Sequence, residues 1–250
     1  VSNYRPISVL PSISKVFEKL VYNRLINYLT KFSILSNQQY GFRSNLSTSL
    51  AILEMVETIT DATDSNEFSI GLFIDLSKAF DTINHKILID KLEFYGIRGI
   101  ALNWFKSYLS NRQQYVLYNG TASPRLSLTC GVPQGSILGP ILFLIYVNDI
   151  VNVSPILHLI LFADDTNIFL SHRDLPTLIR MLNVELKLLN SWFIANRLSL
   201  NVDKTHFIIF KGVRKKYNTG DLSEKLVIDN KPISQVMSTQ FLGVFIDEHQ

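Results

Sequence analysis

Three aspartates are the residues of this sequence whose type and spacing could do chemistry. Two of them, Asp164 and Asp165, stand side by side in "LFADDTNIFL", between apolar stretches at 156–163 and 166–170. Two such stretches separated by a short polar step predict a β-hairpin with both aspartates at its tip. Aspartate also suits an ordinary turn, because its side chain bonds to nearby backbone N–H groups. The pair by itself therefore leaves both a functional site and a plain turn open.

The third aspartate, Asp75, lies near the end of "EFSIGLFIDL", an apolar stretch that predicts a buried strand. If this strand and the hairpin are neighbours in one sheet, the three carboxylates meet. Their mutual repulsion needs compensation, and hard divalent cations with oxygen ligands provide it, Mg²⁺ best of all. Two such ions, about 3.5–4 Å apart, can activate an attacking hydroxyl and stabilise the leaving oxygen of a phosphoryl transfer. The pattern therefore predicts nucleotidyl transfer.

The elements that must position these residues alternate between helical and strand periodicity. Apolar residues at helical spacing predict helices, and short apolar runs rich in Phe and Ile predict strands. "TCGVPQGSILGPILFLIYVNDIV" predicts a loop followed by a fully buried helix, because a Gly and Pro turn precedes residues that are apolar on all sides. The predicted helices span about 12–32, 49–59, 78–95, 100–109 and 176–196, and the later strands lie in "HFIIF" and "QFLGVFI". The whole predicts one compact α+β unit.

Composition bounds the class of protein. With 250 residues and 47% hydrophobic content, the chain can bury a large core, either as one domain or as two lobes. Cys130 is the only cysteine, so an intracellular protein of the nucleus and cytoplasm is expected. No signal peptide opens the sequence, and its longest apolar run, 137–147, is too short to span a membrane. Because the chain starts at Val1 rather than methionine, we expect a piece of a longer polyprotein.

The formal net charge of +3 is small, but basic residues gather in "KGVRKKY". The basic cluster consists of Lys211, Arg214, Lys215 and Lys216. Short charge runs usually form a solvated loop. Contact with a phosphate backbone is the alternative.

Five motifs, in order, resemble the successive palm motifs of reverse transcriptases: "FIDLSKAFD", "GVPQGSILGP", "FADD", "LSLNVDKT" and "FLGV". "NYRPISVLPSISKVFEKLVYNRL" and "QYGFR" resemble the fingers of the non-LTR, LINE-type enzymes, especially jockey-like ones. The resemblance covers nearly the whole chain. It implies a right-hand polymerase fold, with an antiparallel palm sheet flanked by helices. Fingers would occupy about 1–68 with a return near 84–125, and palm most of 69–250, without a thumb.

The resemblance also implies catalytic roles. Asp75 and Asp164 match the metal-binding carboxylates, and Asp165 matches a third acid whose ligation is less direct. Two Mg²⁺ ions would be held there, and Mn²⁺ could substitute. Lys204 in "DKT" matches a lysine proposed to protonate the departing pyrophosphate, as general acid catalysis would favour.

Four further residues match positions that bind the incoming nucleotide. Phe80 matches the aromatic gate that leaves no room for a 2′-hydroxyl, although it could be a core residue. Gln134 and Gly135 match a loop beside the incoming nucleotide. Gly135 has no Cβ, so the backbone can approach the nucleotide closely there. The alternative is that these residues form an ordinary turn. Arg43 matches a cation that holds the triphosphate, a role suited to a guanidinium fork, with a surface salt bridge as the alternative.

"FLGV" matches the hairpin that grips the primer end, although its residues alone predict only a buried strand. The primer-grip residues are Phe241, Leu242 and Gly243. The implied function is RNA-directed DNA polymerase activity with an RNA template, a DNA primer and a dNTP, and no membrane. Endonuclease and thumb regions are expected in the full-length element.

Three alternatives remain at this point. A group II intron-type reverse transcriptase and an RNA-dependent RNA polymerase share the palm carboxylates. Phe80 argues against the RNA polymerase, because RNA synthesis needs room for the 2′-hydroxyl. The third alternative is a decayed or domesticated fragment that binds nucleic acid without catalysis, but every expected acid is present.

Overall fold

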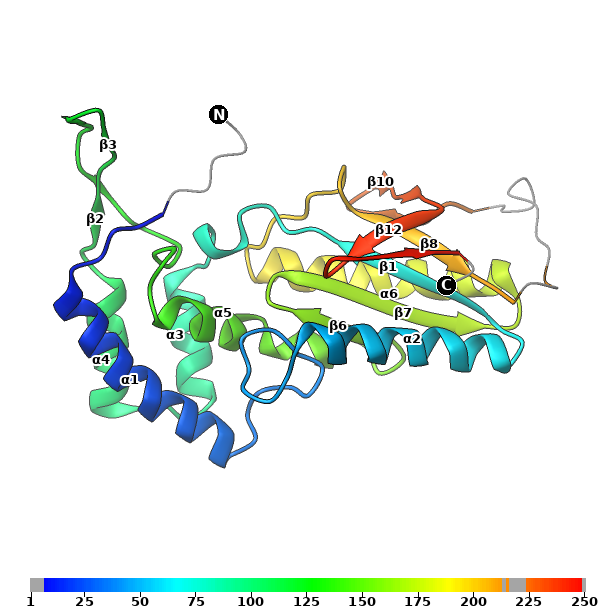
Figure 1. Ribbon diagram of the computed structural model, residues 1–250, viewed down its shortest axis with the longest axis horizontal. Coiled ribbons are helices and arrows are strands. Elements are labelled where there is room, and N and C mark those ends of the chain that lie inside the picture. The colour runs from blue at the N-terminus through cyan, green and yellow to red at the C-terminus, as the bar shows by residue number, and fades with distance from the viewer. Residues whose placement is uncertain (1–6, 213–214, 216–223, 249–250) are drawn as a thin grey trace. The chain divides into compact units, whose positions relative to one another are not determined.

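The computed structural model describes residues 7–212, 215 and 224–248, which form two compact units (Figure 1). The first unit comprises Val1–Leu35 and Lys78–Val147. The second comprises Ser36–Ser77 and Asn148–Gln250. Two members of the basic cluster, Arg214 and Lys216, lie outside the described residues, as does the whole of "NYRP".

The first unit is mainly helical. Its helices are α1 (Ser12–Lys31), the short η1 (Ala79–Asp81), α3 (His85–Phe94), α4 (Gly99–Leu109) and α5 (Leu138–Val147). Every side chain of α5 except Pro140 is buried, which confirms the predicted helix that is apolar on all sides. Two small ribbons follow α4, and their residues are exposed: β2 (Gln113–Gln114) with β5 (Leu126–Ser127), and β3 (Leu117–Tyr118) with β4 (Thr121–Ala122).

The second unit is built on a five-stranded sheet in the order β11-β8-β1-β7-β6. Its strands are β1 (Phe68–Ile74), β6 (His158–Phe162), β7 (Asp165–His172), β8 (His206–Phe210) and β11 (Ser234–Gln235). All pairings are antiparallel except that of β11 with β8. β1 lies at the centre and is buried at every residue, so both faces of the sheet must be covered.

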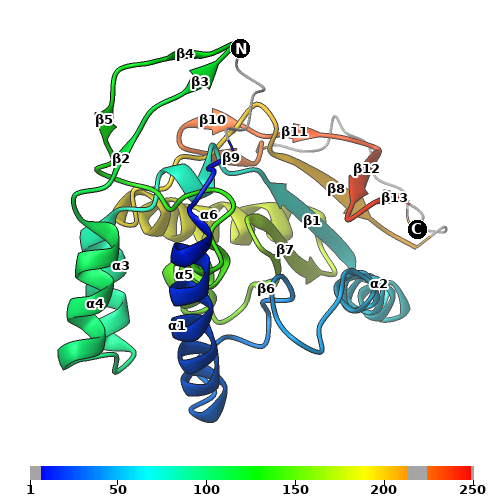
Figure 2. The ribbon, with the colours of Figure 1, turned by 60° about the vertical axis from the view of Figure 1, so that its left-hand side comes forward.

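Two long helices provide that cover, on opposite faces of the sheet (Figures 1 and 2). Helix α2 (Thr48–Asp64) contacts β6, β1 and β7, and its Ala51, Met55 and Ile59 belong to the buried cluster on that face of the sheet. Helix α6 (Leu175–Ala195) contacts β7 and β1 and presents a row of buried leucines. Asp174 caps α6 by accepting from Thr177 N at 3.0 Å, in agreement with the predicted start beside Pro176.

Shorter elements complete the second unit: η2 (Asn148–Asn152), β9 (Val227–Ile228), β10 (Lys231–Pro232), β12 (Ser238–Phe241) and β13 (Val244–Asp247). The interpretation of "QFLGVFI" as one strand is wrong, because β12 and β13 form a hairpin. Leu242 and Gly243 have φ angles of 48° and 92°, and this left-handed backbone reverses the chain. Phe241 and Ile246 are buried in the same hydrophobic cluster as the apolar side chains of α2.

The continuous helix predicted for 78–95 is also wrong. Lys78 has a left-handed φ of 50°, only the short η1 follows it, and α3 begins at His85. The Asn84 side chain accepts from Ile87 N at 3.1 Å and so sets the start of α3. Apolar spacing continues through this break, which is why the pattern alone did not reveal it.

Candidate active site

The β6–β7 hairpin places the aspartate pair. Phe162 pairs with Asp165, so the turn between the strands is only Ala163 and Asp164. Asp164 is partly exposed in the turn, whereas Asp165 is the exposed first residue of β7. The predicted hairpin is confirmed, and its tip is tighter than the sequence indicated.

The register of the sheet brings Asp75 to the same end. β1 pairs with β7 so that Ile74 faces Thr166, and Asp75 and Asp165 are the adjoining residues beyond that pair. The expectation that strand and hairpin are sheet neighbours is therefore confirmed. Asp75 and Asp165 also line one cavity of about 490 Å³.

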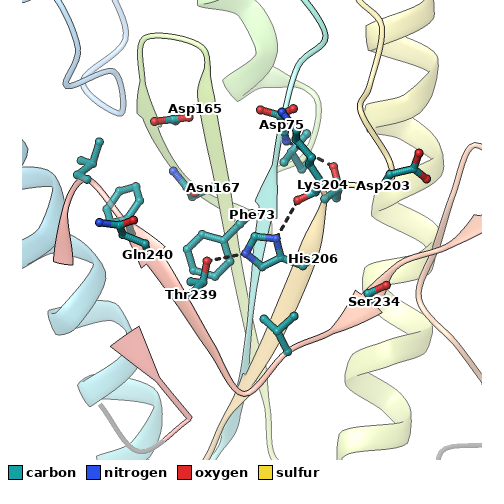
Figure 3. A pocket seen from close by; sticks show the side chains of 15 residues that line it. Phe73, Asp75, Asp165, Asn167, Asp203, Lys204, His206, Ser234, Thr239 and Gln240 are labelled. Atoms are coloured by element: carbon teal, nitrogen blue, oxygen red, sulfur yellow. Dashed lines mark hydrogen bonds between the residues drawn. The ribbon is translucent and has the colours of Figure 1, made fainter. Parts of the chain in front are cut away.

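This carboxylate cavity gathers several of the predicted site residues (Figure 3). Lys204 lines it from the segment before β8, and Phe241 and Leu242 line it from the β12–β13 hairpin. Figure 3 shows Asp165 on the hairpin and Asp75 at the end of β1, with Lys204 on the neighbouring segment. Carboxylates from two elements thus share a hollow with a cation and with the predicted primer grip.

Asn201 holds Asp75 in place, a contact that the sequence patterns did not predict. Its Nδ2 donates to Asp75 Oδ2 at 2.8 Å, and its backbone N donates to Asp75 O at 2.9 Å. Thr205 Oγ1 accepts a longer bond from Asp75 N at 3.4 Å. Both residues belong to "LSLNVDKT", so the motif indicated the segment without indicating the contact.

His206 links the lysine segment to the primer-grip hairpin. Its Nδ1 lies 2.8 Å from Lys204 O, and its Nε2 lies 2.6 Å from Thr239 Oγ1. The ring also stacks on Phe73, with centroids 5.5 Å apart. One signal for these contacts was present in the sequence: His206 is the polar residue of the otherwise apolar strand β8.

Arg43 belongs to the second unit, and the structure shows its guanidinium bound to the backbone. Nη1 donates to Ser36 O at 2.5 Å and to Gln39 O at 3.4 Å. Burial lowers the pKa of Arg43 from its ordinary value. These bonds tie the loop before α2 together, and a role toward a triphosphate stays a prediction.

Phe80, Gln134 and Gly135 belong to the first unit. Phe80 is partly exposed and stacks on the buried Phe143, with ring centroids 4.6 Å apart. Gln134 Nε2 donates to Asp81 Oδ1 at 2.9 Å. Gly135 has a φ of 103°, which a residue with a Cβ adopts only under strain.

Comparison with known proteins decides the family. The model of the family "Reverse transcriptase (RNA-dependent DNA polymerase)" matches residues 1–246. The chain belongs to the reverse transcriptase family. The resemblance inferred from the five motifs is thereby confirmed.

Relatives of this reverse transcriptase chain occur in mobile elements of Drosophila melanogaster. It is 30% identical to the probable RNA-directed DNA polymerase from transposon X-element, over 98% of the chain. It is 26% identical to the RNA-directed DNA polymerase from mobile element jockey, over 99% of the chain. The chain covers 27% of the length of each of these two relatives.

Solved structures share the fold of this reverse transcriptase chain at low sequence identity. Apo telomerase from Candida tropicalis matches with a TM-score of 0.60 and 11% identity, over 92% of this chain and 39% of that one. Telomerase from Candida albicans, solved with a fragment of telomeric RNA, matches with a TM-score of 0.54 and 14% identity, over 94% and 38%. The chain therefore has a polymerase fold.

The donor chemistry of this candidate site suits Mg²⁺, because its charged oxygen donors are carboxylates at adjoining strand ends. Within the described residues, no group of three or more His, Cys, Asp or Glu side chains is already gathered as a metal site. The same residues include no helix that is long and apolar enough to cross a membrane.

Proposed function

We propose that this chain is the fingers and palm module of an RNA-directed DNA polymerase from a non-LTR, jockey-like retrotransposon. It would add deoxynucleotides to a primer 3′-hydroxyl along an RNA template. One observation carries the proposal: Asp75, Asp165 and Lys204 line one cavity beside the Asp164 turn, in a chain of the reverse transcriptase family.

The charged residues in and beside the cavity have chemical roles in this proposal. Asp75, Asp164 and Asp165 would hold two Mg²⁺ ions, for which Mn²⁺ could substitute. When bound, the ions lower the pKa of the attacking hydroxyl and neutralise charge on the phosphates. Asn201 orients the Asp75 carboxylate through the 2.8 Å bond. Lys204 carries the proton that the departing pyrophosphate takes.

Nucleotide and primer contacts come from the remaining predicted residues. Phe80 excludes the 2′-hydroxyl, Gln134 and Gly135 border the nucleotide, and Arg43 holds the triphosphate. Phe241, Leu242 and Gly243 grip the primer end. Support for this last role comes from the hairpin that they form at the cavity.

The proposal also covers the wider organisation. Fingers at about 1–68 with a return near 84–125, and palm over most of 69–250, would be joined in the full-length element by endonuclease and thumb regions. That element would act in the nucleus and cytoplasm. The relatives' greater length agrees with such additional regions.

Primer extension on poly(rA)/oligo(dT) tests the proposal. The purified chain and a thumb-extended chain are incubated with dTTP and Mg²⁺, with an Asp75→Asn variant as the control. Extension by the thumb-extended chain that the variant lacks supports the polymerase. Binding of the hybrid without any extension would instead support a decayed fragment that binds nucleic acid.

A further inference from the structure

The segment Ser36–Arg43 packs against the aspartate hairpin. Leu161 N donates to Gln38 O at 2.9 Å, and Tyr40 N donates to Leu161 O at 2.8 Å. These bonds form a parallel bridge along β6, which is the last strand of the five-stranded sheet. The segment therefore lies directly beside the turn that carries Asp164.

Within this segment, the side chain of Gln39 reaches into the turn. It is only 3% exposed, and its Oε1 accepts from Gly41 N at 2.8 Å and from Ala163 N at 3.0 Å. Its Nε2 donates a longer bond to Ala163 O at 3.5 Å. The side-chain amide of Gln39 therefore binds the backbone of Ala163, the residue before Asp164, through both its oxygen and its nitrogen.

Ala163 needs such support because its backbone is strained. Its φ is 56°, a left-handed conformation in which the Cβ of an alanine crowds the following carbonyl. Strained residues of this kind persist only where their surroundings hold them. Gly41 permits the close approach, because a Cβ there would lie 2.3 Å from Ala163 N.

We propose that Gln39 is a positioning residue that holds the Ala163–Asp164 turn and thereby orients the Asp164 carboxylate. The inference rests on the proposed function, in which Asp164 is a metal ligand. Groups that hydrogen-bond behind a metal ligand fix its orientation, and their removal weakens metal binding. Arg43 stabilises the segment Ser36–Arg43, because its guanidinium donates hydrogen bonds to the Ser36 and Gln39 carbonyls.

The test uses Gln39→Leu, which keeps the approximate volume but accepts no hydrogen bond. The matched control is Gln38→Leu, since Gln38 Oε1 accepts no hydrogen bond from any described residue. Gln39→Glu keeps an oxygen that can accept from Gly41 N and Ala163 N, although it loses the longer bond to Ala163 O, and serves as the rescue variant for the Ala163 amide. If Gln39→Leu fails to fold, Gln39→Asn replaces it, because its amide is one methylene too short to reach both backbone groups.

The first measurement is amide hydrogen exchange of Ala163, which does not depend on any activity. We expect exchange at least about tenfold faster in Gln39→Leu, because that variant lacks the bond that protects the amide. Gln38→Leu and Gln39→Glu should exchange at the wild-type rate. An unchanged Ala163 rate in Gln39→Leu would overturn the inference.

The second measurement is Mn²⁺ binding followed by electron paramagnetic resonance. Gln39→Leu should bind Mn²⁺ about 10-fold more weakly, as found for groups behind metal ligands, whereas Gln38→Leu should match the wild type. If Gln39→Leu bound Mn²⁺ as tightly as the wild type although its Ala163 amide exchanged faster, the positioning role of Gln39 would be rejected. The proposed metal site would not be affected by that result. A wild-type chain that binds no Mn²⁺ would reject the proposed metal site, and the role of Gln39 with it.

Discussion

At the scale of single residues, two of the predicted site residues have contacts that a substitution can test. Asp75 has a bond from Asn201 to its carboxylate and two backbone bonds, and Phe80 has a stacked ring. A substitution that keeps the shape of Asp75 but removes its negative charge therefore tests the role of that charge without disturbing the fold. A substitution that shrinks Phe80 separates a steric gate from a packed core residue.

Asp75→Asn and Asp164→Asn should each abolish primer extension by a thumb-extended chain. The expected loss is at least about 1,000-fold, because a metal ion supplies several kcal/mol of transition-state stabilisation. At position 75, asparagine keeps an oxygen that can accept from Asn201, and position 164 is partly exposed, so the urea midpoint of each variant should stay close to that of the wild type. Extension rates and urea titrations measure the two effects, and undiminished extension by either variant would refute the metal assignment.

Phe80→Val should let the enzyme incorporate ribonucleotides while most deoxynucleotide incorporation remains. The reason is steric, since a smaller side chain no longer overlaps a 2′-hydroxyl and adds little attraction for either sugar. If the stack on Phe143 instead makes Phe80 a core residue, the cavity should cost roughly 1–3 kcal/mol, less than truncation to alanine. Single-nucleotide incorporation rates with a melting curve decide between them: a lowered Tm with unchanged sugar preference would reject the gate.

At the scale of elements, helix α5 begins at a buried acid from another helix. Glu18 on α1 is 1% exposed, and its Oε2 accepts from Ile137 N at 2.7 Å. Its other oxygen accepts from Tyr108 Oη at 3.2 Å. A carboxylate at a helix N-terminus satisfies amides that have no partner within the helix and interacts favourably with the helix dipole.

This arrangement predicts a stability change at high pH. Burial first, and then the charge of Glu18, raise the pKa of Tyr108 from 10.0 to about 12. The unfolded chain therefore loses this proton at lower pH than the folded chain, so stability is full below pH 10 and falls between pH 10 and 12. Urea midpoints across this range should fall more steeply for the wild type than for Tyr108→Phe. The exposed Tyr118→Phe is the control, and parallel curves for wild type and Tyr108→Phe would contradict the prediction.

At the scale of the whole molecule, the small net charge conceals an uneven distribution. Residues 94–148 contain no Asp or Glu but carry Arg98, Lys106, Arg112 and Arg125. The basic cluster at 211–216 adds more positive charge. Within it, Lys215 already lies over the Phe68 ring at 4.1 Å, and burial lowers its pKa.

An RNA/DNA hybrid should bind weakly and in a salt-dependent way, because cations that bind phosphates release counterions. Combined Lys211→Gln, Arg214→Gln and Lys216→Gln should weaken binding and reduce the salt slope by about 0.7–0.9 for each phosphate that is no longer neutralised. Lys215 is left intact because it packs on Phe68. Fluorescence anisotropy at several salt concentrations measures this, with the exposed Lys187→Gln on α6 as a control. An unchanged slope would identify the cluster as a solvated face.

The sequence by itself determined most of the long helices and the main strands of the sheet, and which residue types could do the chemistry. Helical periodicity predicted α1, α2, α4 and α6, and apolar runs predicted β1, β8 and the aspartate hairpin. These signals are local, because they depend on side-chain spacing within one segment. The five ordered motifs also indicated the family, which the match over residues 1–246 confirmed.

Only the tertiary structure decided how these segments meet. The pairing of Ile74 with Thr166 brought Asp75 beside Asp165, and the bridge at Leu161 brought Gln39 to Ala163. Strand register and contacts between distant segments arise from packing of the whole sheet, so no local spacing contains them. The break before α3 and the turn at Leu242 escaped prediction for a related reason: left-handed backbone at non-glycine residues leaves little trace in an apolar pattern.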